Sequence, residues 1–195
     1  MALQKNDELN FYERYFEEAP LNDDEKRKRI DLAEELEILF LYLFVAIDEP
    51  GIESIIIEKY QEIATKHMGM DNTPAYIVSL SQACVNEVAR TTRENIDTAY
   101  YTSKERAANI GADQAHNIFE YKDYTDAVKQ GKTRKIWVSM LLKTTRPAHW
   151  DAHGQEVGIF QKFHVGDSDF DFPKDLKYNP SADQVINCFC HCKYL

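Results

Sequence analysis

Histidine and cysteine residues gather in the last quarter of this chain, between Thr144 and Cys192. The stretch holds three of the four cysteines and four of the six histidines, namely Cys188, Cys190 and Cys192 with His149, His153, His164 and His191. Imidazole nitrogen and thiolate sulfur are the ligands that zinc prefers in proteins. The sequence therefore offers three options for this stretch: a metal site, a catalytic site, or a tail that folds by ordinary packing.

The spacing of these residues favours the metal site. His149 and His153 are four residues apart, so both imidazoles project from one face if Pro147 starts a helical turn. Cys188 and Cys190 alternate to one side of an extended strand end. A tetrahedral set of two soft thiolates and two imidazoles without an open position is typical of structural zinc. We predict that His149, His153, Cys188 and Cys190 hold a structural zinc ion.

Two alternatives to this ligand set stay open. The two cysteines are separated by one residue, whereas zinc-finger cysteines are usually about two to four residues apart, so the histidines could instead make hydrogen bonds beside packed thiols. One predicted ligand could also be replaced by His164, His191 or Cys192. Of these three, His191 and Cys192 adjoin the cysteine pair.

The acidic loop with Asp167, Asp169 and Asp171 has the alternating pattern of a calcium-binding loop. However, Phe172 and Tyr178 stand where such a loop has its glycine and its final glutamate. We therefore predict a solvated loop at this place.

The helices that must carry these residues are predicted from apolar spacing. Asn22 and Glu25 form a capping box that opens a helix ending before Gly51, and Thr73-Pro74 opens a long helix toward Ile96. Further helices are expected over residues 52–67, from about 103 to a break near Gly111, and over 115–128.

After Gly131 the pattern changes to short apolar runs rich in β-branched and aromatic residues. These runs, 134–141, 156–163 and 183–189, predict strands. The fold class expected is α+β, with a mainly helical N-terminal part followed by a small β-containing C-terminal subdomain. We divide the chain into a helical extension or docking region, 1–70, and a domain, 71–195, with helices in 73–130 and a small α+β part in 132–195.

Charge and hydropathy limit the classes of function. The chain has 195 residues, of which 23 are basic and 33 acidic, and its net charge of −10 disfavours nonspecific attraction to nucleic acid. The longest apolar run, from Ile38 to Ile47, has ten residues, about half of what spans a bilayer. It predicts a core or interface helix and no membrane anchor. The N-terminal stretch lacks the pattern of a secretory signal, so a cytoplasmic chain is expected.

Several motifs in order along the chain resemble one known family. They are the series Thr145-Arg146-Pro147-x-His149-x-x-x-His153-Gly154, the pair Asn187-Cys188-x-Cys190, and upstream Val88 to Glu94 with Gly111 and Trp137. Over residues 85–192 the chain is similar to the C-terminal domain of phage Mu F-like minor head proteins. Phe189 departs from the pattern, because the family commonly has arginine there, and His191 and Cys192 are additional.

The resemblance implies a phage or prophage head morphogenesis protein that is present in few copies per virion. Its expected location is the virion or the bacterial host cytoplasm. Its expected partners are the portal or inner capsid proteins, and any contact with DNA would be indirect. It would assist head assembly or genome delivery.

Catalysis is the competing function. Domains of this family occur beside toxin modules, and Arg146, His149 and His153 could supply a cationic clamp and a general acid and base for metal-independent RNA cleavage. A basic substrate groove is also needed, and five nearby aspartates oppose it: Asp151, Asp167, Asp169, Asp171 and Asp175. We therefore expect no enzyme and keep the nuclease or toxin-type domain as the alternative.

Overall fold

The computed structural model describes residues 11–17, 19 and 21–195. The described residues form two compact units, one within 11–15 and 27–115 and the other within 16–17, 19, 21–26 and 116–195. Helices dominate, and antiparallel sheets of three and two strands lie toward the C-terminal end. The predicted α+β class is therefore confirmed, whereas the predicted division at residue 70 remains a prediction.

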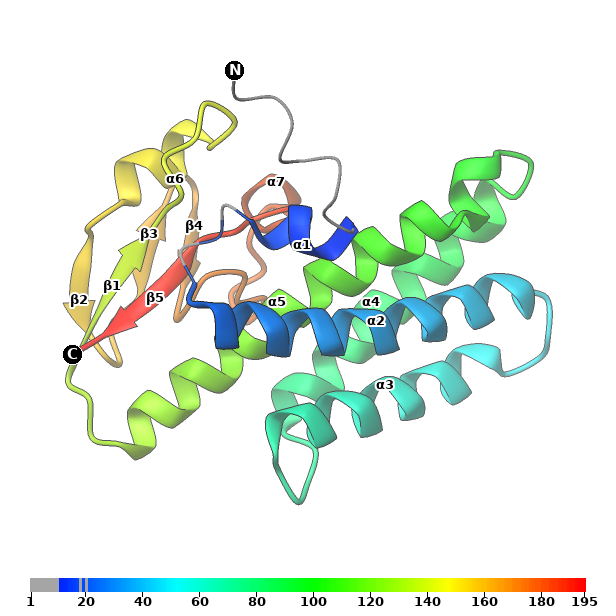
Figure 1. Ribbon diagram of the computed structural model, residues 1–195, viewed down its shortest axis with the longest axis horizontal. Coiled ribbons are helices and arrows are strands. Elements are labelled where there is room, and N and C mark those ends of the chain that lie inside the picture. Colours follow the sequence, from blue (N-terminus) through cyan, green and yellow to red (C-terminus); the bar gives the residue numbers. More distant parts are fainter. Residues whose placement is uncertain (1–10, 18, 20) are drawn as a thin grey trace. The chain divides into compact units, whose positions relative to one another are not determined.

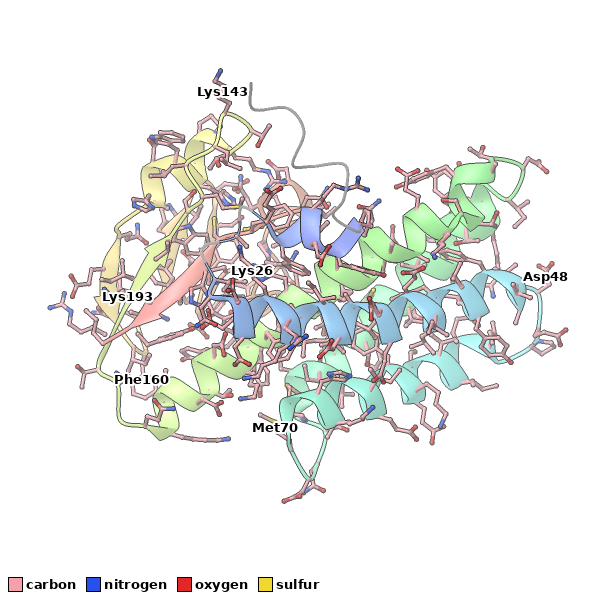
Figure 2. The ribbon with its side chains drawn as sticks, in the orientation of Figure 1. Lys26, Asp48, Met70, Lys143, Phe160 and Lys193 are labelled. Carbon is pink, nitrogen blue, oxygen red and sulfur yellow. The ribbon has the colours of Figure 1, made fainter. Side chains whose placement is uncertain are left out.

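The first unit is built from helices (Figure 1). The helices of the described chain up to residue 129 are α1 (Phe11–Phe16), α2 (Asp23–Val45), α3 (Ile52–Met68), α4 (Ala75–Glu94), the 3-10 helix η1 (Ala99–Thr102) and α5 (Lys104–Lys129). Asp48 and Met70 mark the connections at the two ends of α3 (Figure 2). Polar contacts tie α3 to its neighbours: His67 lies 3.0 Å from Glu35 of α2, and Gln61 donates to Ser81 of α4 at 3.0 Å.

The predicted start of α2 is confirmed by its cap. The backbone N–H of Asn22 donates to the Glu25 carboxylate at 2.8 Å, and the Glu25 N–H donates to Asn22 Oδ1 at 3.0 Å. This reciprocal pair satisfies two backbone donors that a helix start leaves open.

The predicted break near Gly111 is wrong. Helix α5 continues through this residue from Lys104 to Lys129. A Cβ at Gly111 would lie 2.6 Å from the backbone oxygen of Ala33 on α2. Gly111 is thus needed for the close approach of two helices, and its cost in helix propensity, about 1 kcal/mol, is too small to end the helix.

The apolar run of α2 has one packed face and one open face. Leu36, Phe40 and Leu43 are completely buried. On the other side Ile38, Tyr42 and Val45 are 68%, 53% and 87% exposed. None of the helices in the described part of the chain has the length and apolar character to cross a membrane.

The second unit is organised around a small sheet. Strand β1 (Arg134–Val138) lies between β2 (Glu156–Gly158) and β5 (His191–Tyr194), antiparallel to both, and β3 (Phe163–Val165) pairs with β4 (Ser168–Phe170). Lys135 and Trp137 share the buried face of β1. The Trp137 ring contacts the rings of Phe163 and Phe170, with centroids 5.3 and 5.7 Å away. The Trp137 ring also contacts the ring of His149, a predicted ligand, with centroids 5.8 Å apart.

The prediction of a strand over 183–189 is wrong. Residues Ala182–Val185 form a short helix, α7, and the backbone then turns at Asn187 with φ 53°. The run 156–163 forms β2 at its start and, after a turn, reaches the first residue of β3 at Phe163. Short apolar runs suit a strand and a buried turn equally well, so packing decides between them.

Candidate metal centre

Three of the four predicted zinc ligands meet in the second unit. His149 lies on α6 (Pro147–Ala152), and Cys188 and Cys190 lie in the segment between α7 and β5. All three side chains are buried, and their ligand atoms lie within 4.8 Å of one another. Two regions of the chain separated by about forty residues therefore form one buried cluster that could hold a metal ion.

The spacing of the ligand atoms fits a tetrahedral ion. The Nδ1 atom of His149 lies 3.2 Å from Cys190 Sγ and 3.5 Å from Cys188 Sγ. Zinc bonds of about 2.3 Å to sulfur and 2.0–2.1 Å to nitrogen place such ligand atoms roughly 3.6 Å apart at the tetrahedral angle. These three atoms could occupy three of the four positions around zinc, and the described residues add no fourth ligand to the cluster.

The orientation of His149 is set by Gln184. Its Nε2 atom lies 2.9 Å from the side-chain oxygen of Gln184, a buried residue on α7. An amide oxygen only accepts hydrogen bonds, so Nε2 carries the proton and Nδ1 presents its lone pair to the two sulfurs. Histidines that bind metals usually have such a partner on the second nitrogen.

The structure does not bring His153 into this cluster. Helix α6 ends at Ala152, and His153 follows in a non-helical conformation with ψ 126°. Its side chain is exposed, and its Nδ1 accepts the backbone N–H of Ser139 at 3.1 Å. His149 and His153 thus do not share a helical face, because the helix ends one residue too early.

The two thiols differ in how readily they ionise. The hydrogen bond with Cys190 lowers the pKa of Cys188, and the contact with His149 acts in the same direction. The same bond with Cys188, together with burial, raises the pKa of Cys190. Of the two thiols, Cys188 therefore loses its proton first.

Two buried polar atoms beside Cys190 support a second ionised sulfur. Trp137 Nε1 and Ser139 Oγ are buried with no acceptor among the described residues other than the Cys190 sulfur, and hydrogen bonds from both oppose the rise in the pKa of that thiol. A thiolate bound to a metal is an acceptor that would satisfy these two donors. The residues present therefore fit a metal ion at His149, Cys188 and Cys190.

The other candidate ligands lie elsewhere. His164 is exposed and lies 3.0 Å from Asp169, whereas His191 lies 2.8 Å from Glu120. Burial, followed by the charge of Glu120, raises the pKa of the Cys192 thiol. Cys192 is therefore held as a neutral thiol outside the cluster.

The aspartates of the acidic loop have separate partners. Asp167 accepts from Ser168 and Ser181, and Asp171 is buried with Lys177 at 2.8 Å. In the described structure these side chains do not form a shared cation site. Arg146, a residue of the nuclease alternative, donates to the backbone oxygen of Ile186.

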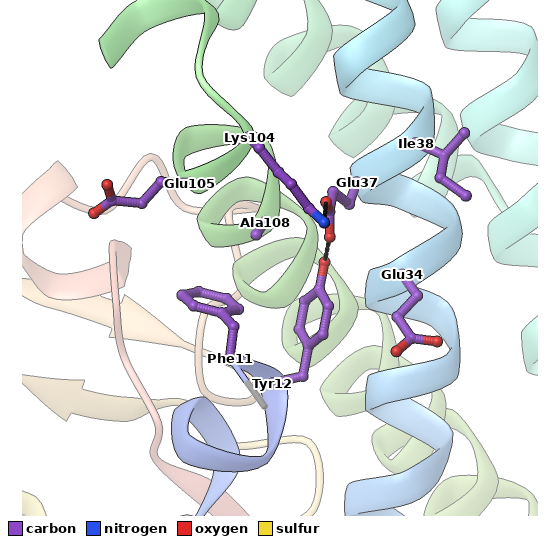
Figure 3. Close-up of a pocket in the computed structure, with 8 residues that line it drawn as sticks. All are labelled: Phe11, Tyr12, Glu34, Glu37, Ile38, Lys104, Glu105 and Ala108. Carbon is purple, nitrogen blue, oxygen red and sulfur yellow. Dashed lines mark hydrogen bonds and ion pairs between the residues drawn. The ribbon is translucent and has the colours of Figure 1, made fainter. Parts of the chain in front are cut away.

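The first unit contains a pocket of about 610 Å³ between α1, α2 and the start of α5 (Figure 3). Tyr12 donates a hydrogen bond to Glu37 at its edge, and Lys104 lies 3.7 Å from the same carboxylate. Burial raises the pKa of the Tyr12 hydroxyl, and the bond to Glu37 adds to this effect. These groups are satisfied by one another, so the metal cluster is the stronger candidate site.

No family model, curated protein or solved structure matches this chain. The functional argument therefore stands on the sequence motifs and on the geometry of the cluster. Sequence reasoning missed Gln184 and Ser139, for which no pattern gave a signal. It marked Trp137 only as an aromatic residue in a strand.

Proposed function

We propose that this protein is a minor head protein of a phage or prophage, and that its second unit is held together by a structural zinc ion on His149, Cys188 and Cys190. The observation that supports the zinc ion is the convergence of three ligand atoms on one buried point, with Gln184 orienting the imidazole. When bound, zinc would crosslink α6 to the segment before β5 and add folding free energy.

Support for the head protein comes from the residues of the resemblance. Arg146 and Pro147 position α6, and Arg146 bonds to Ile186 just before the cysteine pair. The two motif segments thus meet in space, as expected if the motif is the signature of a folded unit. The exposed apolar stripe of α2, formed by Ile38, Tyr42 and Val45, suits contact with a portal or inner capsid protein.

The nuclease alternative draws no support from the geometry around His149. That histidine is buried, with one nitrogen on Gln184 and the other facing two sulfurs. RNA cleavage by the wild-type chain that disappears in His149→Ala, while the variant stays folded, would favour the nuclease.

Elemental analysis of the purified full chain tests the zinc site. We expect this site to bind about one zinc per chain and to retain it through dialysis. The double variant Cys188→Ser with Cys190→Ser should lose this zinc. Cys84→Ser is the matched control, because Cys84 lies on α4 in the first unit. His153→Ala separately tests the fourth predicted ligand. Equal zinc content in the double variant and in wild type would contradict the site.

Copurification tests the head function. The full chain is expressed together with the portal protein encoded in the same genome, and the complex is isolated by size-exclusion chromatography. We expect the chain to elute with the portal. Introducing negative charge on the α2 stripe, by Ile38→Glu with Val45→Glu, should reduce binding at least tenfold. The control is Ile55→Glu on α3, whose side chain is 49% exposed. Absence of the chain from both portal complexes and assembled heads would contradict the proposal.

A further inference from the structure

The pocket of the first unit continues into the exposed apolar stripe of α2. Three apolar side chains line the pocket, those of Phe11, Ile38 and Ala108. Ile38 also begins the stripe, and Tyr42 and Val45 follow it at helical spacing, so all three lie on one face of α2. Exposed apolar side chains grouped in this way commonly mark an interaction surface. We call the pocket and the stripe together the docking face.

The charged side chains of the docking face are mostly acidic. The carboxyl groups of Glu34, Glu37 and Glu105 line the pocket, together with one amino group, that of Lys104. Tyr12 donates a hydrogen bond to Glu37, and Lys104 lies beside the same carboxylate (Figure 3). Glu34 and Glu105 are exposed at the mouth of the pocket. The charge of the docking face therefore favours a positively charged partner.

The spacing of the stripe favours a helix as the occupant. Ile38 and Val45 are about 10 Å apart along the axis of α2. A second helix laid along α2 would present apolar side chains at the same spacing of about three to four residues, which is how amphipathic helices bind apolar surfaces. Toward the start of α2, a lysine or arginine of that helix would reach Glu34 and Glu105. The partner element that fits is therefore an amphipathic helix with a basic end.

A second copy of this chain fits the docking face less well. In a parallel pair of α2 helices, Glu34 of one copy would face Glu34 of the other. In an antiparallel pair with Ile38 opposite Val45, Glu34 would lie near Asp48 and Glu49, which follow α2. Like charges would meet in both pairs, and the net charge of −10 on each chain adds to the repulsion. A basic partner is therefore favoured over self-association.

We propose that the docking face binds an amphipathic helix of a partner protein. The apolar side of that helix would pack on Ile38, Tyr42 and Val45, and a lysine or arginine at its end would lie beside Glu34 and Glu105. The inference deepens the α2 contact of the proposed head function, and it rests on that proposal for the identity of the partner. Burial of apolar surface supplies most of the affinity, and the charges determine which end of the helix lies at the pocket.

Fluorescence anisotropy of the full chain tests the docking face. The probe is a labelled synthetic helical peptide of about 18 residues, roughly 27 Å long, with leucines on one face and lysines at one end. We expect it to bind, and the variant Ile38→Ala with Tyr42→Ala to bind about tenfold more weakly, because two exposed apolar anchors are lost. Glu34→Gln with Glu105→Gln should weaken binding about threefold and reduce its salt dependence.

Matched controls lie on α3. Ile55→Ala removes an apolar side chain that is 49% exposed, and Glu58→Gln with Glu62→Gln removes two exposed carboxylates. Both controls should keep the wild-type affinity. Where circular dichroism shows that a variant is unfolded, the comparison of the lysine peptide with a peptide carrying glutamate in place of lysine decides on the wild-type chain.

Several results would overturn the docking face as a site for a basic helix. They are the absence of binding by the lysine peptide, equal binding of the glutamate peptide, and unchanged affinity in Ile38→Ala with Tyr42→Ala. A dimer of the free chain in sedimentation that is lost in Ile38→Glu would assign the face to a second copy. Coelution with the portal without peptide binding would overturn the docking mode and keep the head function. Peptide binding at this face without portal binding would contradict the head function alone.

Discussion

At the scale of residues, the two nitrogens of His149 have different partners. One nitrogen donates to Gln184, and the other faces Cys188 and Cys190 at 3.5 and 3.2 Å. The protonation state of the ring is thus fixed by a residue that binds no metal itself. The affinity of the cluster for zinc should therefore depend on Gln184 as well as on the ligands.

Replacement of Gln184 by leucine tests this dependence. The variant keeps the volume but leaves the buried Nε2–H of His149 without an acceptor, so we expect zinc affinity to fall about 10- to 100-fold. Competition with a chromogenic chelator measures the affinity. Gln130→Leu, in the exposed turn after α5, is the control. Unchanged affinity in Gln184→Leu would show that the hydrogen bond does not orient the ligand.

Lys135 is a second residue whose buried environment should make protein stability depend on pH. Its ammonium group is buried, donates to the backbone oxygen of Asp171 at 2.5 Å and lies over the rings of Tyr124 and Phe163. Burial lowers the pKa of Lys135. Between this lowered value and about 10.4, the ordinary pKa, the unfolded chain holds a proton that the folded chain has released. Stability from this group therefore rises with pH across that window.

Lys135→Met removes this contribution. We expect the difference in free energy of unfolding, wild type minus variant, to be flat near neutral pH and to increase as pH approaches about 10.4. Urea unfolding of both proteins across this range measures the difference. Lys193→Met, at an exposed position of β5, is the control and should give a constant difference. A constant difference for Lys135→Met as well would mean that the lysine stays charged throughout.

At the scale of elements, α5 shows how packing overrides a local signal. A glycine inside an apolar pattern commonly indicates a helix end, yet Gly111 lies within a helix of 26 residues. Its missing side chain allows α5 to approach the backbone of α2 at Ala33. The same residue therefore weakens the helix locally and permits the contact that stabilises it.

Gly111→Ala should lower stability for this reason. Alanine favours the helix by about 1 kcal/mol, but its Cβ would lie 2.6 Å from a backbone oxygen that cannot move alone. Overpacking of this kind costs about 1–3 kcal/mol, so we expect a net loss of about 1–2 kcal/mol. Thermal and urea unfolding measure it. Glu105→Ala, exposed on the same helix, should change stability by less than about 0.5 kcal/mol. A stabilised Gly111→Ala protein would contradict the close approach.

At the scale of the whole molecule, all the proposed metal ligands lie in one of the two compact units. His149, Cys188 and Cys190 all lie within residues 116–195. The first unit has no such group of ligands among its described residues. The two units should therefore respond differently when metal is removed.

Chelation followed by hydrogen exchange measures this difference. We expect amides of β1, β5 and α6 to lose protection when zinc is removed, because metal binding contributes folding free energy to their unit. Amides in the middle of α3 and α4 should exchange at the same rate with and without metal. The double variant Cys188→Ser with Cys190→Ser should show the same exchange rates as the chelated wild type. Adding chelator to this variant should not change the exchange rates of β1, β5 and α6 further. Equal loss of protection in both units would contradict a local role for the metal.

The sequence by itself determined most of the elements with long apolar periodicity, the cap at Asn22 and Glu25, and a set of candidate ligands, of which the structure brings His149, Cys188 and Cys190 together. Those features depend on residues close together in the chain or on the chemistry of single residue types. Tertiary structure alone decided where α6 ends, that residues 182–185 form a helix, and that Gln184 and Trp137 lie beside the ligands. Each of these depends on contacts between segments far apart in sequence. Local spacing can therefore suggest His153 as a ligand, but tertiary packing decides that its imidazole bonds to the backbone of Ser139 and does not join the cluster.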